Sequence, residues 1–156
     1  MKYTIFGESH GPAVGVVLED VPAGLELDME LIRGMLSRRA PGRDPTATAR
    51  READEPRILS GVMDGRTTGA PLCAVIENTD THSADYEELR FKPRPSHSDY
   101  AAWVKYGGNN DPRGGGHFSG RLTAPLVFAG AVAEQILRNK GVSVQTCISV
   151  LGGVND

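Results

Sequence analysis

The chain has 156 residues, of which 39% are hydrophobic and 24% are charged, and its formal net charge is −3. This length and composition predict one folded domain with its own core, and the net charge argues against general affinity for nucleic acid. No apolar run reaches membrane-spanning length and the N-terminus lacks the layout of a signal peptide, so we expect a cytoplasmic protein without membrane contact.

The first half of the chain predicts two β-hairpins with a helix between them. Four segments have the composition of strands: 3–6, 13–19, 57–63 and 70–77. Gly11-Pro12 would turn the first pair, and residues 65–69 would turn the second. Asp28 is a suitable N-cap for a helix whose apolar residues recur at helical spacing to about Arg38.

The second half predicts two helices and a last strand. A short helix is expected after Asp99, reaching about Tyr106, and a longer helix over residues 123–139. The longer helix is apolar nearly all round, which is typical of a helix inside a core. A strand is expected over residues 142–151, and residues 40–54 form a long basic loop of the kind that is usually functional or disordered.

A glycine loop framed by two arginines is the most informative segment. It runs from Arg113 through three glycines, residues 114–116, to Arg121 and into the apolar helix. Glycines permit unusual dihedral angles and close backbone approach, a helix start offers N–H groups, and arginines add positive charge. The segment predicts an anion cradle for a phosphorylated ligand; the alternative is a glycine-rich surface turn.

Arginine dominates the basic residues. It accounts for 13 of the 17, and eight arginines lie between Arg33 and Arg66. Arginine suits planar, bidentate contact with phosphate or carboxylate. Acidic residues, among them Glu52 and Asp54, are interspersed with these arginines, so a salt-bridged surface is an equally good explanation. Composition leaves both interpretations open.

Histidines supply the candidate proton donors and acceptors. His10 and His97 each lie in a polar loop beside small or rigid residues, and imidazole exchanges protons near neutral pH. His117 lies inside the glycine loop, where it would hydrogen-bond a bound anion, whereas His82 is typical of a solvated loop. Taken singly, a structural or surface role is the simpler interpretation for His10 and for His97.

Other familiar site patterns are disfavoured. Residues 7–11 match the G-x-S-x-G nucleophile elbow around Ser9, but Pro12 and a predicted strand stand where an elbow requires a helix. No Walker or dinucleotide-binding fingerprint occurs, and no pair of histidines has metal-ligand spacing, so we expect no metal site. Cys73 and Cys147 are too few and too distant for a disulfide framework, and we expect both to be buried thiols.

The order of short motifs along residues 4–138 closely resembles the chorismate synthase family. These motifs are Phe6-Gly7-Glu8-Ser9-His10-Gly11, Pro22-Ala23-Gly24-Leu25, Arg38-Arg39-Ala40-Pro41-Gly42, Arg50-Arg51-Glu52, Leu59-Ser60-Gly61-Val62, Thr67-Thr68-Gly69, Asn78-Thr79-Asp80, Arg94-Pro95-Ser96-His97-Ser98-Asp99-Tyr100, Lys105-Tyr106-Gly107 and the glycine loop. One such motif is weak, but the whole set in this order is specific.

The resemblance implies an enzyme that eliminates phosphate from 5-enolpyruvylshikimate 3-phosphate to give chorismate, and that requires reduced FMN although no net redox change occurs. It implies an α+β fold, with antiparallel β-sheets packed against helices in a β-α-β sandwich, and assembly as a homotetramer. A non-catalytic phosphate- or flavin-binding module is the alternative. Whether the protein reduces its flavin with NADPH or relies on an external reductase stays open.

The resemblance also implies roles for individual residues. His10 would be the acid that assists phosphate departure, and His97 would protonate or hydrogen-bond the reduced flavin. Substrate contacts would come from Ser9, Arg39, Arg43, Arg113 and Arg121. Flavin contacts would come from His117, Phe118 and Ser119.

The chain departs from the family pattern in two places and in length. His117 and Phe118 replace the arginine and serine that usually follow the glycines, so Ser119 alone matches there. Pro45 replaces an arginine often found in the basic loop, a contact that Arg43 would have to supply. Family members are much longer, so the resemblance implies that residues 1–156 are the N-terminal portion of a single chorismate synthase domain. Its flavin site would then be incomplete, and the chain alone poorly active.

Overall fold

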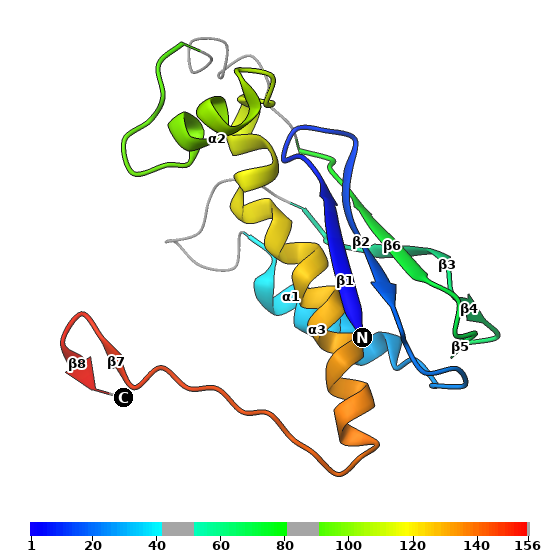
Figure 1. Ribbon diagram of the computed structural model, residues 1–156. Coiled ribbons are helices and arrows are strands. Elements are labelled where there is room, and N and C mark those ends of the chain that lie inside the picture. The colour runs from blue at the N-terminus through cyan, green and yellow to red at the C-terminus, as the bar shows by residue number, and fades with distance from the viewer. Residues whose placement is uncertain (42–51, 81–90, 156) are drawn as a thin grey trace.

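The computed structural model describes residues 1–41, 52–80 and 91–155. Its main body is a four-stranded antiparallel sheet in the order β1-β2-β6-β3, formed by Lys2–Gly7, Ala13–Glu19, Leu72–Glu77 and Pro56–Ser60. Helices α1 (Met29–Arg39) and α3 (Thr123–Arg138) cover one face of the sheet, and α2 (Asp99–Tyr106) lies near the β1–β2 turn (Figure 1). The predicted α+β fold, with antiparallel strands against helices, is confirmed.

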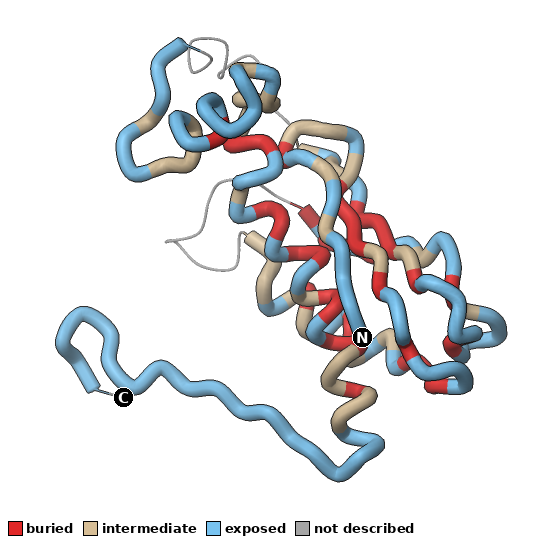
Figure 2. Tube along the Cα trace, viewed as in Figure 1, coloured by how far each residue is buried: buried red, intermediate tan, exposed pale blue. Residues whose placement is uncertain are grey.

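Strands β1 and β2 form the first predicted hairpin. Lys2 lies opposite Glu19 at its open end, and β2 pairs in turn with β6. Side chains alternate across a strand, so every second residue of β2 points toward the helices. Val14, Val16 and Leu18 are these residues, and each is 0% exposed. Figure 2 shows the buried residues gathered between the sheet and the helices.

The second predicted hairpin is present, but its connection differs from the expected one. Strands β3 and β6 pair antiparallel. The single turn expected over residues 65–69 is wrong, because Val62–Met63 (β4) and Arg66–Thr67 (β5) form a small hairpin of their own. Asp64 and Gly65 have φ angles of 50° and 76° and make the two-residue turn that Asp-Gly favours.

Helix α1 begins where the sequence predicts. Asp28 Oδ1 accepts a hydrogen bond from the backbone N–H of Leu31 at 2.9 Å, which caps the helix. Its apolar face buries Ile32 and Leu36. Pro41, two residues beyond the last helical residue, has no N–H with which to continue the helix.

The predicted helices α2 and α3 are also present. Phe128 and Val132 of α3 are 0% exposed and belong to the core. The expectation that α3 is buried all round is wrong in extent, since Leu126 is 42% exposed on the opposite side of the helix. One face is enough because the sheet and α1 lie on one side of α3. No helix in the described ranges is long and apolar enough to cross a membrane.

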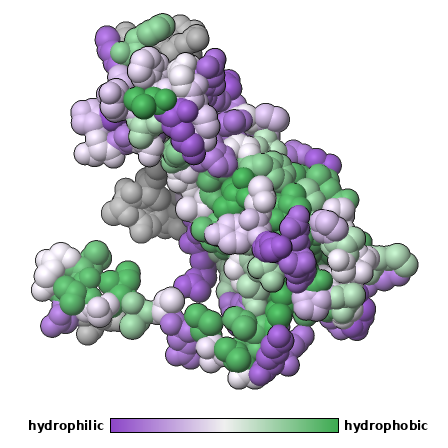
Figure 3. Space-filling model, in the orientation of Figure 1, coloured by the Kyte–Doolittle hydropathy of each residue, from purple (hydrophilic) through white to green (hydrophobic). Residues whose placement is uncertain are grey.

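The C-terminal segment departs most from expectation. Residues 142–149 are extended and exposed, and only Val150–Leu151 (β7) forms a strand, paired with Val154–Asn155 (β8). The expected strand is absent over residues 142–149, because in the described ranges no neighbouring strand pairs with this segment through backbone hydrogen bonds. Cys147 is therefore exposed rather than buried, while Cys73 is half-buried. Figure 3 shows hydrophobic residues gathered on the C-terminal hairpin.

Candidate active site

The turn between β1 and β2 carries Ser9 and His10, and the glycine loop lies directly against it. The backbone N–H of Ser9 donates to the carbonyl oxygen of Gly116 at 3.1 Å. His117 Nδ1 donates to the carbonyl oxygen of Gly7 at 2.9 Å. These bonds fix two segments that are far apart in sequence. A strand follows Ser9, in agreement with the sequence argument against a nucleophile elbow.

The three consecutive glycines hold the two candidate histidines close to one backbone segment. Their φ angles are 57°, 87° and 55°, the unusual conformations predicted for them. A Cβ on Gly114 would lie 2.3 Å from His10 Cε1, and a Cβ on Gly115 would lie 2.7 Å from His97 Cε1. Both distances are too short for any side chain. The structure therefore brings His10 and His97 to consecutive residues of the glycine loop.

His97 contacts a charged pair, Asp99 and Arg94, which the sequence did not single out. Its Nδ1 lies 2.5 Å from Asp99 Oδ1, and Asp99 Oδ2 accepts from Arg94 Nε at 2.8 Å. Hydrogen bonds from the Arg94 side chain keep the pKa of the Asp99 carboxyl well below its ordinary value, although burial opposes this shift. Asp99 is thus an ionised acceptor beside His97. An acid two positions after a candidate histidine, at the start of a predicted helix, was the available signal.

Arg113, at the upstream end of the glycine loop, forms a bidentate pair with Asp111. Its Nη2 and Nε lie 2.8 Å and 2.9 Å from Asp111 Oδ2 and Oδ1. Burial raises the pKa of Asp111, but the hydrogen bonds and charge of Arg113 and the charge of His10 outweigh it, and that pKa is lowered. The Arg113 side chain is 44% exposed. It can therefore exchange part of its contact for a soluble anion.

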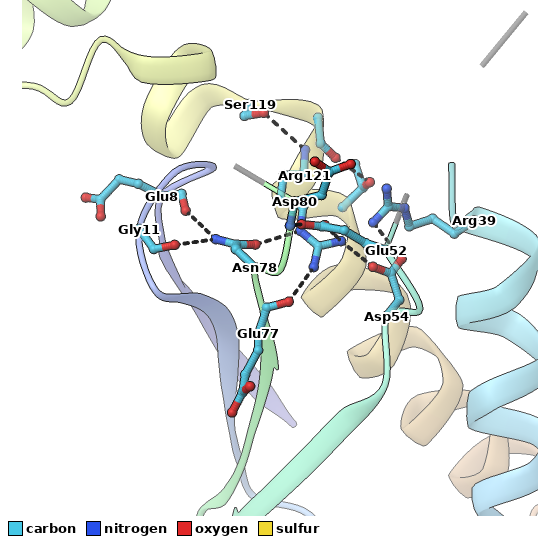
Figure 4. A network of polar contacts seen from close by, with 12 residues as sticks. Glu8, Gly11, Arg39, Glu52, Asp54, Glu77, Asn78, Asp80, Ser119 and Arg121 are labelled. Carbon is cyan, nitrogen blue, oxygen red and sulfur yellow. Dashed lines mark hydrogen bonds and ion pairs between the residues drawn. The ribbon is translucent and has the colours of Figure 1, made fainter. Parts of the chain in front are cut away.

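Arg121, at the downstream end, is buried in a network of carboxylates (Figure 4). Its Nη1 lies 2.7 Å from Glu52 Oε2 and is also paired with Asp54 Oδ1, and all three side chains are at most 2% exposed. Arg39 Nη1 joins the network at 2.9 Å from Asp54 Oδ2. For Arg39 and Arg121, the salt-bridge interpretation of the arginine-rich composition describes what the structure contains.

Asn78 connects this buried network to the turn that carries His10. Arg121 Nε donates to Asn78 Oδ1 at 2.9 Å. Asn78 Nδ2 donates to the carbonyl oxygens of Glu8 and Gly11 at 3.0 Å and 2.8 Å (Figure 4). The side chain of Asn78 thus bridges both ends of the His10 turn and the guanidinium of Arg121. Apart from its place in a motif, no sequence signal indicated this residue.

The residues after the glycines lie at the surface and do not lead directly into α3. Two short 3₁₀ segments, Arg113–Phe118 and Gly120–Leu122, precede that helix, so the expectation that the loop runs straight into the helix start is wrong. Ser119 Oγ accepts from the backbone N–H of Arg121 at 3.3 Å. Phe118 is 38% exposed and its ring lies 6.2 Å from that of the exposed Tyr106. Two predicted positions, Arg43 and His82, fall outside the described residues.

Comparison with known proteins identifies the family to which this arrangement belongs. A family model described as chorismate synthase matches residues 1–156. The chain belongs to the chorismate synthase family. It is 54% identical over 153 residues to a chorismate synthase of Aeropyrum pernix and 50% identical over 154 residues to one of Thermococcus kodakarensis. These matches cover 98% and 99% of this chain but 40% and 43% of the relatives, so the chain spans about two fifths of their length.

A solved structure agrees with the sequence comparison. The crystal structure of a chorismate synthase is similar to this chain with a TM-score of 0.60 and 30% sequence identity. The match covers 90% of this chain and 35% of that one. The described part of the chain therefore has the fold of part of a chorismate synthase.

Proposed function

We propose that this chain carries the histidine-bearing part of a chorismate synthase active site, which eliminates phosphate from 5-enolpyruvylshikimate 3-phosphate to give chorismate. One observation carries the proposal: His10 and His97, from distant segments, both pack against consecutive glycines of one loop. A shared loop allows one imidazole to reach a bound substrate and the other to reach a flavin beside it, and general acid–base catalysis requires each group to lie within hydrogen-bond reach of its proton partner. From the family resemblance we also propose a homotetramer in the cytoplasm.

In this proposal, His10 donates a proton to the departing phosphate. Its ring lies beside Gly114 and near the charge of Asp111, and Ser9 Oγ shares the same contact at 3.0 Å from a Cβ placed on Gly114. Arg113, half-exposed and adjacent to this pair, is placed to attract the phosphate or a carboxylate of the substrate. Arg39, at the end of α1 and paired with Asp54, and Arg43 of the basic loop would contact the substrate.

Arg121 takes a different part in the proposed site. Its guanidinium is buried against Glu52 and Asp54, and a substrate contact would require these ion pairs to open. Opening would deprive two buried carboxylates of the cation that contacts both, which costs several kcal/mol. We therefore assign Arg121 the task of holding the His10 turn through Asn78.

The residues around the loop fit reduced FMN. Phe118 and Tyr106 offer exposed aromatic faces, and the loop glycines hold His97 next to the segment that leads to Phe118. His117, Phe118 and Ser119 would contact the flavin, and His97 would protonate it or hydrogen-bond to it. Reduced flavin supplies electrons reversibly, which suits an elimination without net redox change.

The test replaces the matching segment of the Aeropyrum pernix relative with residues 1–156 of this chain. The chimera is assayed anaerobically with reduced FMN and 5-enolpyruvylshikimate 3-phosphate, following phosphate release and chorismate absorbance together. We expect turnover, and we expect His10→Ala or His97→Ala to lower kcat by roughly 10²–10⁴-fold, the usual contribution of a general acid or base. Affinity for reduced FMN should change much less.

The matched control is Arg66→Ala. Arg66 lies on the β4–β5 hairpin, where it is an exposed cation paired with Glu26. The variant should leave turnover unchanged. A folded chimera without turnover, beside an active relative, would refute the proposal. Turnover that survives alanine at both histidines, with ligand binding intact, would favour the non-catalytic binding module instead.

A further inference from the structure

We propose that Asp99 is a positioning residue that fixes the tautomer of His97, with the proton on Nδ1, so that Nε2 is the nitrogen that faces the glycine loop. The consequence for catalysis rests on the proposed function above. The tautomer itself does not, because it follows from contacts within this chain.

The contact between the two side chains determines which ring nitrogen carries the proton. His97 Nδ1 lies 2.5 Å from Asp99 Oδ1. A carboxylate has no proton to donate and would repel the lone pair of an unprotonated Nδ1 at this distance, so Nδ1 carries the proton. In the neutral ring, one nitrogen is a donor and the other an acceptor. Neutral His97 therefore carries its lone pair on Nε2.

Asp99 is itself held in place and kept ionised by Arg94. Its Oδ2 accepts from the backbone N–H and from Nε of Arg94 at 3.0 Å and 2.8 Å, and its Oδ1 accepts from Nη2 at 3.0 Å. The Asp99 side chain is 10% exposed. These bonds lower the pKa of Asp99, so the carboxylate persists well into the acid range. Asp99 cannot turn away from His97 without losing several bonds to Arg94.

The other edge of the ring faces the glycine loop. A Cβ placed on Gly115 would lie 2.7 Å from His97 Cε1 and 2.9 Å from Nε2. The lack of a side chain on Gly115 thus lets the Cε1–Nε2 edge of the ring pack directly against the loop backbone. Arg94 Nη2 lies 3.2 Å from both ring nitrogens. A nitrogen atom at these two distances in the plane of the ring would collide with Cε1, so Nη2 lies over the face of the ring. His97 is thereby fixed in both orientation and protonation.

Replacing Asp99 with asparagine gives a specific prediction. In the wild type, Asp99 Oδ2 accepts two of the three hydrogen bonds from Arg94, so the side-chain oxygen of the asparagine should take the position of Oδ2. Its NH₂ group would then face His97 Nδ1 as a donor. We expect Asp99→Asn to invert the tautomer and place the proton on Nε2, with little change in shape.

The experiment is nitrogen NMR of the chain labelled with ¹⁵N-histidine, at a pH about two units above the usual histidine pKa of about 6.5. His97→Gln assigns the His97 signals. We expect a protonated Nδ1 and an unprotonated Nε2 in the wild type, and the reverse in Asp99→Asn. Asp28→Asn makes the same change at another helix N-terminus and should leave the His97 signals as they are. A protonated Nε2 in the wild type, or an unchanged tautomer in folded Asp99→Asn, would overturn the proposal.

A second readout separates this proposal from the proposed function. In the chimera, Asp99→Asn should lower kcat roughly 10²–10⁴-fold with little change in affinity for reduced FMN, since Nε2 of the inverted neutral ring has no lone pair with which to take up the proton that His97 would pass to the flavin. An inverted tautomer with full turnover would support the role of Asp99 as a positioning residue and refute the proposed role of His97. Full turnover with an unchanged tautomer would overturn the positioning role alone.

Discussion

The two ends of the glycine loop contain the same residue in opposite environments. Arg113 is 44% exposed and paired with Asp111, whereas Arg121 is 2% exposed and contacts Glu52 and Asp54. In sequence, both arginines frame the loop in the same way. In the structure, a soluble anion could reach Arg113, whereas Arg121 is buried and supports the His10 turn through Asn78. Charge near a loop therefore indicates binding only when the charge is accessible.

The difference arises from how each arginine is compensated. Arg121 and Arg39 pair with Glu52 and Asp54 in a network in which the Arg121, Glu52 and Asp54 side chains are buried. An ion pair removed from water is costly to break and sensitive to the loss of one member. The Arg113 pair remains partly solvated, so the loss of one member is partly compensated by water.

The largest expected effect is from Arg121→Met, which removes the buried cation that contacts both Glu52 and Asp54. We expect a loss of about 3–5 kcal/mol in the free energy of unfolding, as for other buried pairs broken on one side. Urea denaturation followed by circular dichroism measures it. Replacing Arg121, Glu52 and Asp54 together by apolar residues should recover part of the loss. A cost below about 1 kcal/mol for Arg121→Met would contradict the contrast between the two ends.

The loop between the two arginines is expected to tolerate no side chain at Gly114. A left-handed conformation costs an alanine roughly 1–2 kcal/mol, and its Cβ would also meet the His10 ring. Gly114→Ala should therefore lower stability and displace His10, seen as changed His10 signals in NMR spectra. Gly120→Ala is the control, since a Cβ there would meet nothing within 4 Å. Equal behaviour of the two variants would show that the loop does not contact His10 as described.

The Arg94–Asp99 pair tests an intermediate environment, with side chains 33% and 10% exposed. The folded-state pKa of Asp99 lies below its ordinary value of 3.8. Its contribution to stability is thus complete above that value and is lost as pH falls toward the lowered one. The difference in free energy of unfolding between wild type and Asp99→Asn should shrink as pH falls below 3.8, because the variant has no carboxylate to protonate. A difference that grows over this acid range would contradict the shift.

The smallest effect is expected from Arg113→Ala. Because the guanidinium is 44% exposed, its pair with Asp111 should contribute no more than about 1 kcal/mol to stability. Binding of inorganic phosphate or substrate should weaken instead, which isothermal titration calorimetry can measure. A large loss of stability with unchanged anion binding would reverse the roles assigned to the two arginines.

Local patterns predicted the regular elements well where the physical signal is local. The cap at Asp28 and the apolar spacing of α1 depend on neighbouring residues, and both were predicted. Residues 142–149 have strand-like composition but remain extended and exposed, because a strand needs a partner that composition does not supply. The Asp64-Gly65 turn was missed although its dipeptide signal was available.

The sequence by itself determined the family, the antiparallel hairpins and the helices, and it identified His10 and His97 as candidate proton donors and acceptors. Motif order and side-chain periodicity are properties of the chain and need no coordinates. Only the tertiary structure decided that Gly114 and Gly115 contact His10 and His97, that Asp99 orients His97, and that Arg121 is buried while Arg113 is not. The physical reason is that accessibility and charge compensation depend on residues brought together from distant parts of the chain, which no local pattern encodes.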